Sequence, residues 1–474
     1  MTRPSLLNFF CVGNRTIDLL CGRASVCRLH SSQTMRSVAS RAVSGFRPSK
    51  VAVVTKTTRC EFEQQRYRFA GLSEVDLTQL LALKGSSYSG LLERHNIHTR
   101  NVEHIVKSLK KEGIEVRVVR RGEYDEEVVR WADAIISAGG DGTMLLVASK
   151  VFSKDKPIVG VNTDPERSEG HLCLPVHYTH AFSEALERLQ RGEFRWQWRQ
   201  RIRLHLEGTG INPTPVDLHE QQLSLEQHHL AHRITTLERR RDDSFSEPNL
   251  LPVRSLNEIF IGESLSSRYI NMSKPWHSFC SNPVTFPKHI PSPALTSPSL
   301  SVQHRVKYKS LDPHLTFSLH RASYYEISVD DGPWEKQKSS GLSICTGTGS
   351  KAWSYNINKL VEQAVEDLLK IGKLQTGLDI PLDPGFIEKV TEEYNQSLVF
   401  SPEDQRLFFS IREPIVNRVF SSIRQRGFAK KVCVRSRCWD ACMVVDGGTS
   451  FEFNDGAIAT ISISDEDQLR TVLL

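Results

Sequence analysis

Five consecutive residues, Gly139-Gly140-Asp141-Gly142-Thr143, form the clearest chemical pattern in the chain. They follow the apolar run 134–137 and precede the apolar run 144–152, so they predict a turn between a buried strand and a helix. Glycines let a backbone approach a phosphate, and the free N–H groups at a helix N-terminus point at it. A carboxylate there can orient a hydroxyl, accept its proton or hold Mg²⁺. The structural alternative is a plain strand–turn–helix junction, which three glycines around one Asp disfavour.

Two later segments offer groups suited to a nucleoside. Asn257 can donate and accept hydrogen bonds, and Glu258 can accept them from hydroxyls. Residues 346–354 read Thr-Gly-Thr-Gly-Ser-Lys-Ala-Trp-Ser, with one cation and one aromatic ring. This run is not a Walker A loop, because it contains no Gly-Lys-Ser/Thr with a glycine five residues before it. An Asn-Glu pair alone is uninformative, but its place before the Gly-Thr-Gly-Ser run gives it weight.

The glycine-rich turn resembles that of three kinase groups: the NAD kinases, the diacylglycerol and sphingosine kinases, and, more loosely, the phosphofructokinases. All three transfer a nucleotide phosphoryl group to an alcohol, so the turn indicates the reaction and leaves the acceptor open. Residues 257–258 resemble the Asn-Glu/Asp pair of NAD kinases, and residues 346–354 resemble their Thr-Pro-Thr-Gly-Ser-Thr-Ala-Tyr-Ser element. Gly347, Lys351 and Trp353 stand where that family has Pro, Thr and Tyr.

The resemblance extends from about Val51 to Leu474 and includes 160–162 and 446–448. The sequence departs from the family at 163–172, where a Gly-Leu-Gly-Phe-like stretch is usual. It departs again at Ser340, where many members have Asp. Together with a long helical insert near residue 360, these departures resemble the divergent mitochondrial branch of the family.

The resemblance implies an enzyme that transfers the γ-phosphoryl group of ATP to the 2′-hydroxyl of the adenosine ribose of NAD. Asp141 would orient and deprotonate that hydroxyl. NAD and ATP are the expected ligands, with Mg²⁺ accompanying ATP and no separate metal site in the protein. Family members assemble as dimers or larger oligomers, so we expect at least a homodimer. The residues expected to contact the nucleotides are Gly140, Gly142, Thr143, Asn162, Asn257, Glu258, Thr348, Gly349, Ser350, Lys351, Ala352, Trp353, Ser354 and Asp446.

Two other functions stay open at this point. A lipid kinase of the diacylglycerol or sphingosine type shares the glycine-rich turn, but it gives no reason for the segments at 257–258 and 346–354. A catalytically disabled NAD-binding protein would keep those segments and lack turnover.

The order of expected elements places the motifs in two domains. Strands alternate with helices over 51–195, which predicts a Rossmann-like α/β domain with a parallel sheet. Short strand-like runs then dominate, beginning with 196–206 as one strand, and predict a β-sandwich-like domain over 196–445. A single helix, 357–372, interrupts it, and the polar segment 217–250 reads as a mobile loop. The remaining residues, 446–474, are expected to form strands that pack back on the first domain, which completes the NAD kinase fold.

The first fifty residues read as a mitochondrial transit peptide. They contain seven Arg and Lys50 against one acid, Asp18, a net charge of +7, whereas the whole chain carries +6. An Arg- and Ser-rich, acid-poor N-terminus is typical of such peptides, so we expect location in the mitochondrial matrix. Because the rest of the chain is nearly neutral, we expect no nucleic-acid partner. No apolar run approaches the length of a membrane span, so no membrane partner is expected.

Residues 269–321 interrupt the resemblance. Members of the mitochondrial branch run from the equivalent of 266–268 directly into that of 322–326, so these 53 residues are an insert. They contain seven Pro and one acid, a composition that argues against a packed core. We interpret the insert as a retained intron, an unusual splice form or a gene-model error. If translated, it either loops out at small entropic cost or disturbs the neighbouring Asn257–Glu258 site.

Of the ten cysteines, three form a cluster in the sequence: Cys433, Cys438 and Cys442. Its spacing could suit zinc, but the segment reads as a strand pair. Buried free thiols are therefore the favoured interpretation.

Overall fold

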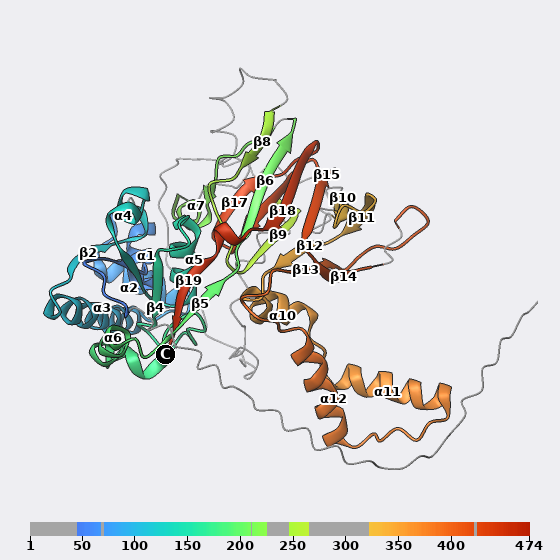
Figure 1. Cartoon of the computed structure of the whole chain (residues 1–474), viewed down its shortest axis with the longest axis horizontal. Coiled ribbons are helices and arrows are strands. Elements are labelled where there is room, and N and C mark those ends of the chain that lie inside the picture. The colour runs from blue at the N-terminus through green and yellow to red at the C-terminus, as the bar shows by residue number, and fades with distance from the viewer. Residues whose placement is uncertain (1–44, 68–70, 210, 225–245, 265–321, 421–423) are drawn as a thin grey trace, which may run out of the picture. The chain divides into compact units, whose positions relative to one another are not determined.

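The computed structural model describes residues 45–67, 71–209, 211–224, 246–264, 322–420 and 424–474 (Figure 1). Three predicted segments lie wholly or mostly outside this part of the chain: the transit peptide, the middle of the polar loop and the insert 269–321. In the described ranges, no helix is long and apolar enough to cross a bilayer.

The first domain is built on a six-stranded sheet (Figure 1). Neighbours from β2 to β19 pair in parallel, and only β5 runs antiparallel, against β19. The short apolar runs predicted as strands are fully buried in it, as expected for a sheet covered on both faces. Its strand order is β2 (Glu115–Val119), β1 (Lys50–Thr55), β3 (Ala134–Ala138), β4 (Pro157–Val161), β19 (Leu469–Leu473) and β5 (Arg195–Arg199).

Helices cover both faces of this sheet. On one face, α3 (Tyr88–Lys111) and α6 (Phe182–Arg191) pack apolar side chains at helical spacing against the strands. On the other face lie α4 (Glu126–Trp131) and α5 (Asp141–Lys150). The short helices α1 (Arg59–Arg66) and α2 (Glu74–Leu83) both begin with a capping box, and both contact α3.

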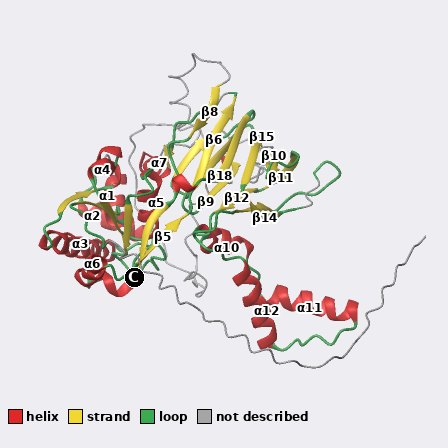
Figure 2. Cartoon of the chain, viewed as in Figure 1, coloured by secondary structure: helices red, strands yellow, loops and turns green. Residues whose placement is uncertain are grey.

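The second domain consists of two antiparallel sheets that share one apolar core (Figure 2). The inward side chains of both sheets, such as Leu204, Ile261 and Val434, are completely or almost completely buried. The first sheet has the order β11 (Glu335–Ser339), β10 (Ser323–Val329), β15 (Lys431–Ser436), β18 (Ala457–Ile463), β6 (Ile202–Gly208) and β8 (Ser246–Leu250). The second has the order β14 (Arg426–Ala429), β13 (Leu407–Arg412), β12 (Gly341–Cys345), β9 (Glu258–Glu263), β16 (Ala441–Val445), β17 (Thr449–Glu452) and β7 (Val216–Asp217). The predicted fold class, α/β followed by a β-sandwich, is therefore confirmed.

The expected boundary at residue 195 is wrong by one strand. The run 196–206, predicted as one strand, is divided between β5 in the first sheet and β6 in the second domain. The chain changes sheets at Gln200 and Arg201, where the Gln200 N–H donates to Pro402 at 2.8 Å. Alternating side chains continue through the break, so the sequence pattern does not reveal it.

Two further expectations are corrected. The flanks of the polar segment 217–250 are ordered as α7 (Leu218–Ser224), whose Leu218 packs against Cys442 and Val444, and β8, which pairs with β6. Of the final strands, β17 and β18 belong to the second domain, and only β19 joins the first sheet.

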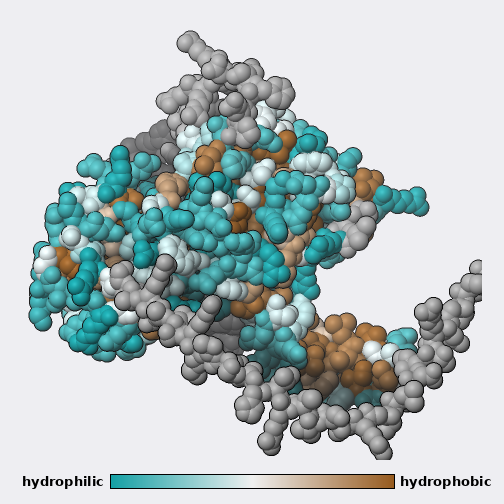
Figure 3. All heavy atoms as spheres, in the orientation of Figure 1, coloured by the Kyte–Doolittle hydropathy of each residue, from teal (hydrophilic) through white to brown (hydrophobic). Residues whose placement is uncertain are grey.

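The predicted helix 357–372 is in fact part of a three-helix segment: α10 (Trp353–Asn358), α11 (Glu362–Thr376) and α12 (Pro384–Ser397). Gly377, in the left-handed conformation, ends α11, and Asp383 caps α12. Apolar side chains of α11 face solvent, and Figure 3 shows apolar surface gathered over this segment. Leu368, Ile371 and Leu374 are 62%, 56% and 83% exposed.

The two ends of the segment that contains the insert lie next to each other. The N–H of Glu263, the last residue of β9, donates to the hydroxyl of Ser323, the first residue of β10, at 2.9 Å. A connection between adjacent points needs only a few residues, so the 53 residues of 269–321 are not required to span a distance.

Deleting residues 269–321 is therefore expected to leave the fold intact. The shorter loop loses less closure entropy, so the free energy of unfolding should rise by up to about 2 kcal/mol. Urea unfolding of the parent and the deletion variant measures this. A second variant, with the insert replaced by a Gly/Ser linker of equal length, should match the parent. A fall in stability on deletion would show that the insert contributes to the fold.

Candidate active site

Asp141 is the first residue of α5, directly after the carboxyl end of β3. Its carboxylate accepts the backbone N–H groups of His171 at 3.2 Å and Leu172 at 2.8 Å. These bonds hold the 170–172 loop beside the turn. A Cβ at Gly140 would lie 2.5 Å from the Ser168 hydroxyl, so any other residue would make that hydroxyl move. The backbone at the start of α5 is thus left bare, as a phosphate site requires.

Gly142 and Thr143 lie differently in this turn. Gly142 is exposed, with no atom near the position of a Cβ, so the backbone there is accessible. Thr143 is 8% exposed, and its side chain packs against Gly139 and so supports the turn. Asn162 is also buried: its amide donates to the Ser168 carbonyl at 2.6 Å and accepts the Asp164 N–H at 3.1 Å. Both side chains therefore shape the turn and its neighbouring loop.

Asp446 organises the Asn257–Glu258 segment. Its carboxylate accepts the Ser255 hydroxyl at 2.7 Å and the N–H groups of Leu256, Asn257 and Glu258 at 2.7, 2.8 and 3.0 Å. Asp446 adopts a φ of +48°, which an L-residue rarely does without such compensation. These bonds fix the backbone from which the Asn257 and Glu258 side chains project.

Glu258 is a carboxyl with an unusual protonation state. Burial, with the nearby charge of Asp446, raises the pKa of Glu258 to about 8. Burial also raises the pKa of Asp446, but its four hydrogen-bond donors oppose that shift. Glu258 accepts one N–H, from Ser354 at 3.1 Å. Glu258 is therefore the member of this pair that holds a proton at neutral pH.

The 346–354 segment packs directly against Asn257 and Glu258. The Thr346 N–H donates to the Asn257 carbonyl at 2.9 Å, and the Thr346 hydroxyl donates to the Leu256 carbonyl at 2.6 Å. A Cβ on Gly349 would collide with the Asn257 carbonyl, so only glycine allows this approach. The structure thus brings together two of the segments that the sequence singled out.

The other residues of this segment divide into framework and accessible groups. The Ser350 hydroxyl donates to the Gly347 carbonyl at 2.7 Å and accepts the Phe400 N–H at 3.2 Å, so it belongs to the framework. Lys351 is exposed, and Ala352 is partly exposed at the start of α10. The Trp353 ring meets Phe260 edge to face, with centroids 5.4 Å apart, and the Arg412 guanidinium lies 5.1 Å from it.

A buried arginine that sequence reasoning missed, Arg199, contacts the 346–354 segment and is attracted by the charge of Asp141 in the glycine-rich turn. Its Nη1 donates to the Thr348 hydroxyl at 3.3 Å, and the charges of Asp141 and Glu403 attract its guanidinium. Burial lowers the pKa of Arg199 to about 10. The sequence did contain a signal for Arg199: it lies two residues after Gln197, so both polar side chains fall on the same, buried face of strand 195–199.

A second missed arginine, Arg201, connects the domains away from the reacting groups. Its completely buried side chain donates to the Ala148 carbonyl at 2.7 Å and to the Val151 carbonyl, at the C-terminal end of α5. It also donates to the carbonyl of Asp467. The Asp467 side chain in turn pairs with Arg254 at 2.7 Å and with Arg203.

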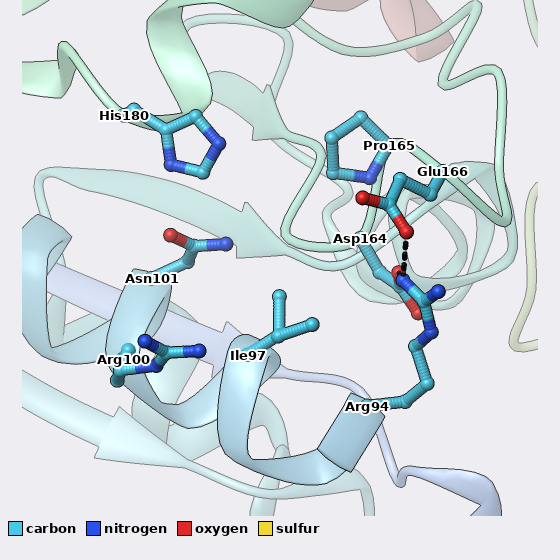
Figure 4. A pocket seen from close by; sticks show the side chains of 8 residues that line it. All are labelled: Arg94, Ile97, Arg100, Asn101, Asp164, Pro165, Glu166 and His180. Atoms are coloured by element: carbon cyan, nitrogen blue, oxygen red, sulfur yellow. Dashed lines mark hydrogen bonds and ion pairs between the residues drawn. The ribbon is translucent and has the colours of Figure 1, made fainter. Parts of the chain in front are cut away.

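A pocket of about 250 Å³ opens beside the carboxyl end of β4 (Figure 4). Four of its residues come from α3 and face the 164–166 loop and His180. Asp164 pairs with Lys56 at 3.2 Å and Arg94 at 3.6 Å, so its charge is compensated. The lining residues are Arg94, Ile97, Arg100, Asn101, Asp164, Pro165, Glu166 and His180.

In the described ranges, no group of three His, Cys, Asp or Glu side chains is arranged to hold a metal. Cys438 and Cys442 are buried and Cys433 is partly buried, and none of the three is in a disulfide. A cation such as Mg²⁺ would thus need oxygen atoms from a ligand as well as from the protein.

Comparisons with known proteins identify the family. The ATP-NAD kinase N-terminal domain matches residues 46–194. Over 460 residues, the chain is 64% identical to a Xenopus tropicalis protein named "NAD kinase 2, mitochondrial", covering 97% of this chain and 98% of the relative. The mouse and human proteins of that name are 67% and 65% identical over 435 residues, covering 92% of this chain and 89% and 86% of theirs.

This chain therefore belongs to the NAD kinase family. Within the family, it matches the mitochondrial NAD kinase 2 proteins over nearly its whole length. Among solved structures, that of yeast NADH kinase with NADH aligns over 90% of this chain and 84% of its own, at 10% identity and a TM-score of 0.43. That likeness is too low to support an argument about the site.

The state of Glu258 predicts a pH dependence of stability. Its pKa rises from 4.5 to about 8 on folding, so the folded state binds more protons between these values. The free energy of unfolding should then fall as pH rises through this window, and Glu258→Gln should remove that fall. Thermal melting between pH 5 and 9 measures the difference, with Glu127→Gln, an exposed position on α4, as control. A constant difference between wild type and Glu258→Gln across this range would contradict the prediction.

Proposed function

We propose that this protein phosphorylates NAD, transferring the γ-phosphoryl group of ATP to the 2′-hydroxyl of the adenosine ribose to make NADP. One observation supports this above all. The 346–354 segment is hydrogen-bonded to Asn257 and Glu258, and Arg199, which donates to Thr348, lies near enough to Asp141 for their charges to attract. Groups suited to a nucleoside are thereby held beside groups suited to phosphoryl transfer.

The groups around Asn257 fit an adenosine. The Asn257 side-chain oxygen is buried and has no hydrogen-bond partner among the described residues, so it can accept from an amino group. Glu258 lies one residue along the same segment and can bond the ribose hydroxyls. The Trp353 ring adds an aromatic surface next to them.

Asp141 supplies the base in this proposal. Its carboxylate accepts the proton of the 2′-hydroxyl as that oxygen forms a bond to the γ-phosphorus of ATP. The bond from the γ-phosphorus to the bridging oxygen breaks, and its electron pair leaves with ADP. The backbone at Gly142 and the N-terminus of α5 face the phosphates. Alignment and charge neutralisation provide most of the rate.

Mg²⁺ fits this site as a companion of ATP. A bound Mg²⁺ commonly takes one or two carboxylates and completes its shell with phosphate oxygens and water. Asp141 is the carboxylate placed to join it, and the ion would neutralise phosphate charge. The role of the chain's own residues is to orient the two nucleotides and to remove the proton.

The location and assembly of the protein are parts of the same proposal. The Arg-rich first fifty residues support import into the mitochondrial matrix. The exposed apolar side chains of α11 support at least a homodimer, because soluble monomers rarely leave such surfaces uncovered. Sedimentation velocity of residues 51–474 measures the assembly.

The direct test is NADP formation by residues 51–474 with ATP, Mg²⁺ and NAD. We expect activity in the wild type and a loss of about a hundredfold or more in Asp141→Asn, which cannot accept the proton. Asp155→Asn, in the exposed loop after α5, is the matched control and should keep full activity. NAD binding without turnover would favour the disabled-binder alternative. Phosphorylation of diacylglycerol or sphingosine without NAD binding would favour the lipid-kinase alternative.

A further inference from the structure

Arg199 occupies a position that its structural contacts do not explain. It is the last residue of β5 and lies opposite Leu469 of β19. Leu469 packs in the same core as Met144 and Val147 of α5, so Arg199 lies on the face of the sheet that α5 covers. From there its side chain reaches Thr348 of the 346–354 segment.

The hydrogen bonds of Arg199 are incomplete for so buried a cation. The residue is 9% exposed, and its Nε has no hydrogen-bond partner among the described residues. Its one hydrogen bond within the described part of the chain, from Nη1 to the Thr348 hydroxyl, is long at 3.3 Å and involves a neutral acceptor. A buried charge is costly unless it is paired and hydrogen-bonded.

Two other buried arginines show how the same protein satisfies a structural guanidinium. Arg201 donates to three backbone carbonyls through Nε and Nη1, although its Nη2 has no hydrogen-bond partner among the described residues. Arg254 pairs with Asp467 at 2.7 Å and donates to two backbone carbonyls at 3.0 Å. Arg199 lacks a comparable set of acceptors, although it is held between the two halves of the proposed site. Its donors are therefore available to an anion that enters the site.

The charge environment indicates where that anion lies. Of the charges that act on Arg199, Asp141 exerts the largest attraction, followed by Glu403. In the proposed reaction, the phosphoryl group passes next to Asp141. A guanidinium presents several N–H donors in one plane, a geometry that matches the oxygens of a phosphoryl group.

We propose that Arg199 is a further catalytic residue, which contacts the phosphoryl group while it moves from ATP to the ribose. This rests on the proposed function, since it names a residue of the same site. The Arg199 donors bond the non-bridging oxygens and neutralise charge that builds on them during transfer. After transfer, the same donors contact the 2′-phosphate of NADP.

The test compares Arg199→Ala with Arg195→Ala, an exposed arginine on the same strand. We expect Arg199→Ala to lower kcat by about a hundredfold or more. It should weaken NADP binding about tenfold while changing NAD binding little, because only NADP carries the 2′-phosphate. Added guanidinium ion should restore part of the kcat of Arg199→Ala. It should not restore that of Asp141→Asn. Arg195→Ala should match the wild type throughout.

The outcomes separate this inference from the proposed function. If the wild type makes NADP and Arg199→Ala keeps its kcat and its preference between NADP and NAD, the Arg199 inference is wrong and the function stands. A loss of kcat that follows a lowered melting temperature, without rescue by guanidinium, would assign Arg199 a purely structural role. If the wild type does not turn over but binds NADP, the function fails, and the NADP-binding comparison alone decides on Arg199. Absence of NADP binding by the wild type would overturn both.

Discussion

The buried side chain of Arg201 is the contact on which the geometry of the site depends. Its guanidinium donates hydrogen bonds to the carbonyls of Ala148 and Val151 at the end of α5 and to the carbonyl of Asp467. It therefore fixes one end of that helix to the second domain. Asp141 stands at the opposite end of the same helix. Because a helix is stiff over ten residues, holding its C-terminus also places the carboxylate at its N-terminus. The position of Asp141 relative to the second domain is thus fixed by contacts at the far end of α5.

Carboxylates act as organisers of the backbone in this protein. Asp446 gathers three consecutive N–H groups and one hydroxyl, and Asp141 gathers two N–H groups of a neighbouring loop. Each arrangement replaces regular secondary structure at a point where the chain must bend. Leu256 and Asn257, just before β9, are irregular, but the bonds to Asp446 hold the backbone from which the Asn257 and Glu258 side chains project.

Apolar periodicity was sufficient to predict the two-domain architecture, because it acts locally. The resemblance to NAD kinases, not periodicity, assigned 257–258 and 346–354 to a nucleotide site. The sequence could not predict the passage from β5 to β6, since the alternation of side chains is the same on both sides of Gln200. It also missed Arg199, whose meaning depends on Thr348, far away in the chain. Asn162 and Asp446 stay predicted ligand contacts, but the sequence did not reveal that their polar atoms also bond the backbone. The hydrogen-bond partners of these side chains depend on tertiary contacts, which a local sequence pattern does not reveal.

The hydrogen bond between Glu263 and Ser323 has a consequence for how the chain can be rearranged. Two points that are adjacent in space and joined by a dispensable connection can serve as new termini. The first and last strands of the described chain, β1 and β19, belong to the same sheet, with only β3 and β4 between them. Because these strands are parallel, the end of β19 and the start of β1 lie at opposite edges of the sheet, so the linker must also run the length of a strand. Such a linker would yield a circular permutant that begins at β10 and ends at β9. Such a protein would keep every strand pairing while separating the two halves of the second domain to opposite ends of the polypeptide.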